Sequence, residues 1–250
     1  MYSGVKTTGY TMGYDSSVGY LDPGTASTAT NVTTVLDWAQ AAGKRTGFVT
    51  TTRMSHATPA ALYSKTVSRF WECDKEIQKS VDKGHVSQDE VDKYKPQDIT
   101  AQLVDGAPGQ GLDILLGGGL ASWLPQPDQP EIRPGWDYDT DEWDCYRQDG
   151  RNLTAEWLDQ HPAGVFVQTR TDLMSLSLEE EAVLGIFTNS YLTWDHLVND
   201  TNEKPRLEDL AVQAVKFLQE KSRDEEGFFV MIEAGRIDAA VRNLFIQSII

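Results

Sequence analysis

The stretch that most constrains the fold is residues 227–238, which read GFFVMIEAGRID. Residues 228–232 form an unbroken apolar run that is too short for a typical helix and lacks the alternation of a half-exposed strand. They therefore predict a strand buried on both faces. Glu233, Arg236 and Asp238 follow this run directly. Because α/β sheets place ligand sites where parallel strands end, we expect these acids to bind a metal ion.

Strand and helix patterns alternate along the rest of the chain. Apolar and β-branched runs predict further strands, and amphipathic spacing or capping signals predict helices between them. The expected strands are residues 47–52, 113–116, 165–169 and 183–187, and the expected helices are residues 33–42, 58–70, part of 74–95, and 207–218. This alternation predicts a single α/β domain over residues 1–250, a three-layer αβα sandwich with a mainly parallel central sheet.

Three local features refine this prediction. Thr58 followed by Pro59 is a strong helix start, with Thr58 as the N-cap and the helix running to about Phe70. Residues 1–30 are rich in Gly, Thr, Ser and Tyr and predict loops around one short helix. Residues 123–149 are rich in Pro, Asp and Trp and predict a long surface excursion.

The composition excludes some partners. The chain has 38 acidic and 22 basic side chains and a formal net charge of -16, which argues against recruitment of nucleic acid by counterion release. No apolar run is long enough to span a bilayer. Cys73 and Cys145 are too few for a disulfide framework, so their redox state stays open. Sequons at Asn31, Asn152 and Asn199 fit glycan acceptors in a secreted protein, or merely chance and helix starts.

Three predicted strand ends carry candidate chemistry. His56 and Thr58 follow the strand at 47–52, a triple glycine at 117–119 follows the strand at 113–116, and Glu233 with Asp238 follows the strand at 228–232. Carboxylate and hydroxyl oxygens suit Mg²⁺, whereas His56 and Asp238 also suit Zn²⁺.

Each of these candidates has a purely structural alternative. Thr58 could only cap its helix, His56 could be an ordinary loop histidine, and Glu233 could pair with Arg236. Arg69 either pairs with a surface acid or directs its planar guanidinium at a phosphate. The glycines lack the Gly-Lys-Ser/Thr ending of a phosphate loop, which favours a turn.

Several motifs together resemble alkaline phosphatases, in the animal rather than the bacterial style. They agree in order and spacing from about Tyr2 to Asp238. The motifs are residues 3–7 (SGVKT), 50–53 (TTTR), 56–61 (HATPAA), 68–69 (SR), 114–119 (ILLGGG), 149–153 (DGRNL) and 232–238 (IEAGRID).

The resemblance implies a homodimeric phosphomonoesterase, extracellular or on the cell surface and possibly lipid-anchored, that uses a serine nucleophile, two zinc ions and one magnesium ion. Carried over residue by residue, His56, Thr58 and Glu233 match the magnesium side of the site. Arg69 matches the phosphate clamp, and Asp238 matches one zinc ligand. The two cysteines do not fall where we expect the family's disulfide partners.

Other positions depart from the family pattern. The family's Asp-Ser-Ala/Gly nucleophile motif belongs before residues 3–7, and Arg242 stands where a zinc-ligating histidine is expected, so residues 239–250 form a divergent tail. We therefore expect an internal fragment, incomplete at both ends of the fold, that lacks the nucleophile and most zinc ligands and is inactive by itself. The alternatives are a non-catalytic magnesium- or phosphate-binding remnant, and a related phosphatase or sulfatase of the same broad fold.

Overall fold

A parallel sheet forms the centre of the molecule. The computed structural model describes residues 2–125, 143, 145–198, 203–222 and 226–247. Five strands lie in the order β3-β4-β2-β1-β5, and all the pairings between them are parallel. The strands are β1 (Arg45–Arg53), β2 (Ile114–Gly118), β3 (Val165–Val167), β4 (Val183–Ile186) and β5 (Phe228–Glu233).

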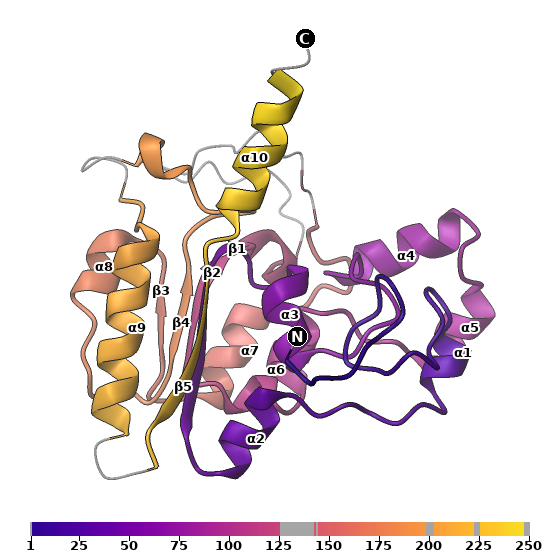
Figure 1. The fold of residues 1–250 in the computed structure, drawn as a ribbon, viewed down its shortest axis with the longest axis horizontal. Coiled ribbons are helices and arrows are strands. Elements are labelled where there is room, and N and C mark those ends of the chain that lie inside the picture. Colours follow the sequence, from indigo (N-terminus) through magenta and orange to yellow (C-terminus); the bar gives the residue numbers. More distant parts are fainter. Residues whose placement is uncertain (1, 126–142, 144, 199–202, 223–225, 248–250) are drawn as a thin grey trace.

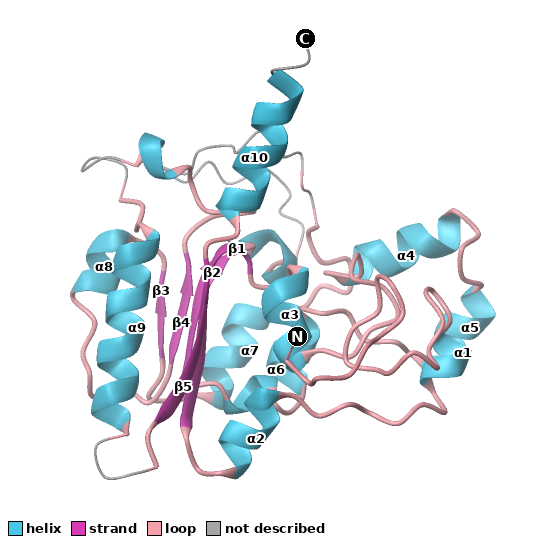
Figure 2. Cartoon of the chain, in the orientation of Figure 1, coloured by secondary structure: helices cyan, strands magenta, loops and turns pink. Residues whose placement is uncertain are grey.

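Helices cover both faces of this sheet, which confirms the predicted three-layer αβα architecture (Figures 1 and 2). One face carries α8 (Arg170–Met174) and α9 (Leu207–Lys221). The other carries α2 (Val35–Ala41), α3 (Ala57–Tyr63), α6 (Ala101–Asp105) and α7 (Leu153–Gln160). Short 3-10 turns occupy Gly109–Gly111, Leu120–Trp123 and Asp195–Leu197.

Two apolar cores lie on either side of the sheet because successive strand residues point to opposite faces. Phe48 and Leu115 belong to the core that also contains Trp157 of α7. Val49 and Leu116 belong to the core that contains Phe217 of α9. The inner strands β1, β2 and β4 are therefore buried on both faces, as in other doubly covered parallel sheets.

The prediction that residues 228–232 are buried on both faces is wrong. They do form β5, but among the described residues β5 pairs only with β1 and lies at the edge of the sheet. Met231 is the only buried member of β5, and Ile232 is 45% exposed. An apolar run therefore identified the strand but not its position, because strand order is set by long-range pairing.

The helix predicted over residues 58–70 is also wrong in its bounds. The helix α3 begins at Ala57, with His56 at the N-cap, and ends at Tyr63. The chain then runs extended, and Thr66 pairs with Met12 in an antiparallel bridge. Pairing with this distant segment, together with the β-branched Thr66 and Val67, replaces further helical turns.

A small satellite lies beside the sandwich. It contains α1 (Pro23–Ala26), α4 (Asp74–Asp82) and α5 (Gln88–Tyr94), which confirms the short helix expected within residues 1–30 and the helices expected within 74–95. Its core is a separate cluster of buried residues: Val18, Val67, Trp71, Ile77 and Val86.

The remaining predictions are tested only in part. Of the excursion expected over residues 123–149, residues 126–142 and 144 lie outside the described residues, as do Asn199 and residues 248–250. The divergent tail begins inside α10 (Arg236–Gln247), which extends beyond the end of β5 (Figure 1). Of the helices in the described ranges, none has both the length and the apolar character needed to cross a membrane.

Candidate functional site

The three predicted strand ends meet at one edge of the sheet. Strand β1 lies between β2 and β5, and all three run parallel, so their carboxyl ends share this edge. The turn after β1 leads into α3, and the turn after β5 leads into α10. This edge is therefore where the candidate side chains of β1 and β5 come together, as expected for an α/β sheet.

Glu233, the last residue of β5, is held by two threonines of β1. The backbone register places it beside Thr50. The Thr50 hydroxyl donates to Oε2 of Glu233 at 2.6 Å, and the Thr52 hydroxyl lies 3.2 Å from the same oxygen. Gly235 makes this arrangement possible, because a Cβ atom there would collide with the methyl group of Thr52. The pairing of Glu233 with Arg236 is not what fixes the carboxylate.

His56 and Arg69 form a second part of the site. A guanidinium nitrogen of Arg69 lies 3.3 Å from Nε2 of His56. Burial lowers the pKa of His56, the charges of Arg53 and Arg69 lower it further, and the charges of Glu72 and Glu233 oppose them. The ring is thus neutral near pH 7, and Nε2 can accept from Arg69 only in the tautomer that carries its proton on Nδ1. In the structure Nδ1 is buried and has no hydrogen-bond partner.

Beneath His56 lies a buried ion pair to which the sequence had assigned no function. Arg53 donates from Nε and from one terminal nitrogen to the two oxygens of Glu72, both at 2.8 Å. Ser55 donates to Glu72 at 2.7 Å. Burial raises the pKa of Glu72, but the charge of Arg53 and the hydrogen bonds from Arg53 and Ser55 outweigh it and leave the pKa below its usual value. This ion pair holds the carboxyl end of β1 in place as a rigid frame for the site.

Aromatic rings complete this frame, and sequence reasoning missed them. The guanidinium of Arg53 lies 4.5 Å from the ring centroids of both Trp143 and Tyr191. Arg236 lies 5.0 Å from the Tyr191 ring and 4.2 Å from that of Trp194. No local sequence spacing predicts these contacts, because the rings come from segments that are distant in sequence from β1 and β5. In the sequence, only Arg53 in the TTTR motif and Arg236 in the IEAGRID motif indicated that these segments belong to the site.

The triple glycine has a packing role. A Cβ atom at Gly117 would lie 2.9 Å from the methyl carbon of Thr50, and one at Gly118 would collide with the carbonyl of Ser190. Gly119 has a φ of 100°, which disfavours other residues. These contacts favour the structural explanation over a phosphate-binding loop.

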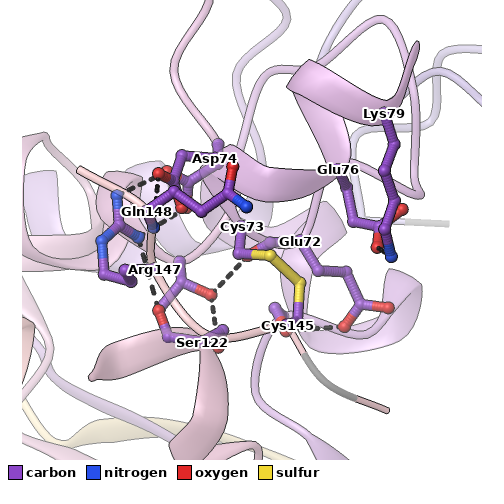
Figure 3. Close-up of a disulfide and its surroundings, with 12 residues drawn as sticks. Glu72, Cys73, Asp74, Glu76, Lys79, Ser122, Cys145, Arg147 and Gln148 are labelled. Atoms are coloured by element: carbon purple, nitrogen blue, oxygen red, sulfur yellow. Dashed lines mark hydrogen bonds and ion pairs between the residues drawn. A yellow bond between two sulfur atoms is a disulfide. The ribbon is translucent and has the colours of Figure 1, made fainter. Parts of the chain in front are cut away.

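A disulfide joins Cys73 to Cys145 and answers the question that the sequence left open. Figure 3 shows it between Glu72 and Arg147. Arg147 is 2% exposed and holds Asp98 through two bonds of 3.2 and 2.9 Å. The same guanidinium also bonds Asp149. The disulfide fastens the segment around Cys145 to the segment that carries Glu72, and the Arg147–Asp98 pair fastens it to the residues just before α6.

Arg69 opens onto a cavity of about 520 Å³ that is also lined by Tyr2, Tyr10 and Ala57. Burial and the negative charge of Glu233 raise the pKa of Tyr2 to about 12. Tyr2 therefore lines the same cavity as Arg69 and also feels the charge of Glu233.

The donor set fits Mg²⁺ better than Zn²⁺. Glu233 and Thr58 offer oxygen atoms as ligands. Nδ1 of His56 has no partner and can donate a hydrogen bond to an oxygen that binds the ion. Asp238 lies in the first turn of α10 with its side chain exposed. In the part of the chain that the structure describes, no three His, Cys, Asp or Glu side chains come together as a cluster for a metal ion of either kind.

Comparison with known proteins agrees with these features. A family model described as alkaline phosphatase matches residues 1–245. Alkaline phosphatase 4 of Drosophila melanogaster is 36% identical over 214 residues, which are 83% of this chain and 33% of that protein. The membrane-bound alkaline phosphatase of Bombyx mori is 34% identical over 245 residues, 95% of this chain and 40% of that protein. The chain thus spans well under half the length of these two relatives.

Solved structures show the same fold. The alkaline phosphatase of Thermus thermophilus has a TM-score of 0.62 at 22% identity, over 96% of this chain and 37% of that one. A variant of the TAB5 alkaline phosphatase with Mg bound in its M3 site has a TM-score of 0.56 at 19% identity, over 95% of this chain and 49% of that one.

Proposed function

Because this chain belongs to the alkaline phosphatase family, we propose that it forms one wall of a metal-dependent phosphomonoesterase site at the carboxyl ends of β1 and β5. The observation that carries this proposal is that Glu233 at the end of β5 lies at the same carboxyl end of the sheet as the contacting pair His56 and Arg69, and that Arg69 lines a cavity. A carboxylate and a guanidinium thus lie at the same end of the sheet, as a site for an anionic substrate and its cation requires.

On the magnesium side we assign Glu233, Thr58 and His56. Glu233 supplies a carboxylate whose position is fixed by two hydroxyls, and Thr58 supplies a neutral oxygen. When bound, Mg²⁺ supplies positive charge that stabilises negative charge developing on oxygen. His56 in its Nδ1-protonated tautomer has a buried N–H without a partner, which can donate to an oxygen bound at this site.

Arg69 is the proposed phosphate clamp. Its guanidinium presents parallel donors that match two oxygens of a phosphate. The neutral His56 ring beside it accepts one of its hydrogen bonds, which orients the fork without competing for the anion. The family to which the chain belongs makes a phosphate monoester the proposed substrate class.

Asp238 is the proposed zinc ligand of this chain, and it needs further ligands to hold the ion. The two zinc ions and the homodimer that the family resemblance implies stay predictions.

A direct test of the magnesium side is calorimetric titration of the 250-residue chain with Mg²⁺. We expect the wild-type chain to bind and Glu233→Gln to abolish the heat, because the change removes the carboxylate charge of the proposed ligand. Glu208→Gln is the matched control: it makes the same chemical change on an exposed position of α9 and should leave Mg²⁺ affinity unchanged. Binding that survives Glu233→Gln at full affinity would contradict the assignment.

We also propose that the 250 residues do not hydrolyse phosphomonoesters by themselves. The sequence contains no Asp-Ser-Ala or Asp-Ser-Gly triplet, and loss of one member of such a catalytic unit typically costs about 10³-fold or more.

The assay is release of p-nitrophenol from p-nitrophenyl phosphate with added Zn²⁺ and Mg²⁺, beside a full-length family enzyme. No metal-dependent turnover is expected. Robust turnover that disappears in Glu233→Gln would overturn this proposal while supporting the site itself. Mg²⁺ binding without turnover would fit both the proposed wall of the site and the second candidate function, a non-catalytic magnesium- or phosphate-binding protein, for which the cavity beside Arg69 is the supporting observation.

An extracellular or cell-surface location is the proposed compartment. Disulfides such as Cys73–Cys145 are typical of oxidising compartments. One relative is described as membrane-bound. Asn31 and Asn152 are exposed, as glycan acceptors must be, although Asn152 also caps α7 through a bond to the Ala155 amide.

A further inference from the structure

The strongest unexplained feature near the site is the threonine pair behind Glu233. Thr50 is 0% and Thr52 1% exposed. The hydroxyl groups of both residues nevertheless point at a carboxylate, that of Glu233. Buried hydroxyls are costly unless they are hydrogen-bonded, so two of them directed at one carboxylate call for a cause.

The direction of the Thr50 hydrogen bond is fixed by its surroundings. A carboxylate oxygen only accepts, so the Thr50 hydroxyl donates to Oε2 of Glu233 at 2.6 Å, while its Oγ1 accepts the amide hydrogen of Thr52 at 3.0 Å. Thr52 has a less defined role, because its hydroxyl also lies 2.7 Å from the Thr50 hydroxyl and 3.1 Å from the carbonyl of Arg53.

The strand register makes the contact rigid. Thr50 and Glu233 are paired positions on adjacent parallel strands, so this side-chain hydrogen bond lies between two backbones that the sheet already holds in register. Both hydroxyls approach the same oxygen, Oε2, and this leaves Oε1 as the oxygen of Glu233 without a threonine partner. A carboxylate held by one oxygen presents the other in a defined direction.

We propose that Thr50, assisted by Thr52, is a positioning residue that orients the Glu233 carboxylate for a divalent cation. This inference rests on the proposed magnesium site and adds a requirement to it: the hydroxyl of residue 50, and not only the carboxylate of residue 233, sets the cation affinity. Outer partners of metal ligands commonly change affinity about 10- to 100-fold when they are removed.

The test compares Thr50→Val, which keeps the shape but loses the hydroxyl, with Thr50→Ser, which keeps the hydroxyl. By calorimetry, Thr50→Val should weaken Mg²⁺ binding about 10- to 100-fold, and Thr50→Ser should bind close to wild type. Thr46→Val is the matched control, since Thr46 is buried in the same strand and bonds Gln40 and Gly111 away from Glu233. It should lower the melting temperature without changing Mg²⁺ affinity.

A metal-free measurement separates this inference from the proposed function. Three-bond NMR couplings of Glu233 should report one χ1 rotamer in the wild type and in Thr50→Ser, and rotamer averaging in Thr50→Val. Unchanged couplings together with unchanged affinity in Thr50→Val would overturn the inference, as would an equal loss of affinity in Thr46→Val. A wild-type chain that shows the fixed Glu233 rotamer but binds no Mg²⁺ would overturn the proposed magnesium site. It would still support the orientation of the Glu233 carboxylate by Thr50.

Discussion

Replacing Arg147 with methionine should lower the free energy of unfolding by about 3–5 kcal/mol, because it leaves a buried charge without its partner. Asp98 is 3% exposed and receives two bonds from Arg147, which is itself 2% exposed. Arg147 also donates to Asp149 and to the carbonyl of Ser122. The measurement is urea unfolding of the purified variant beside the wild type.

Two further variants make this prediction specific. Lys79→Met removes the same charge from a solvent-exposed pair with Glu76, which should cost no more than about 1 kcal/mol. The double change Arg147→Met with Asp98→Leu removes both buried charges and should recover much of the loss, since an apolar pair of similar volume is often neutral. A single Arg147→Met variant as stable as Lys79→Met would show that the buried pair does not support the fold.

Removing the disulfide is the second large change. Cys73 and Cys145 are separated by 72 residues, and the chain-entropy model gives about 4 kcal/mol for a closed loop of that length. We therefore expect the double variant Cys73→Ser/Cys145→Ser to unfold at clearly lower urea than the wild type, with a loss of about 2–5 kcal/mol.

Reduction provides the internal control for the disulfide. Dithiothreitol should lower the stability of the wild type to nearly that of the double variant, and it should not change the double variant. Equal stability of oxidised and reduced wild type would contradict the prediction. Since Trp143 lies two residues from Cys145 and stacks on Arg53, the fluorescence of the reduced protein should also report whether this contact survives.

Much of the architecture could be predicted from local pattern. The strands at 47–52 and 183–187 and the helix at 207–218 appear as β1, β4 and α9 with small shifts of their ends. Alternating strands and helices were enough to predict a covered parallel sheet, because parallel neighbours require crossover helices. The helix predicted over 58–70 was wrong because pairing of Thr66 with Met12 competed with it.

The candidate site was predictable only in its most local part. Glu233, His56 and Arg69 could be proposed from short motifs, because each motif keeps its chemistry within a few residues. The Arg53–Glu72 pair joins residues 19 positions apart, and the bond between Thr50 and Glu233 joins residues 183 positions apart. No spacing rule covers such distances, and they depend on which strands lie side by side.

The sequence by itself determined the class of fold, the family and the residue types at the strand ends, since those follow from local periodicity and contiguous motifs. The tertiary structure alone decided that β5 is an edge strand, that Cys73 meets Cys145, and that two threonines of β1 hold Glu233. The physical reason is that these features depend on strand order and register. Long-range packing sets the order and register of the strands, so they cannot be predicted from any short stretch of residues.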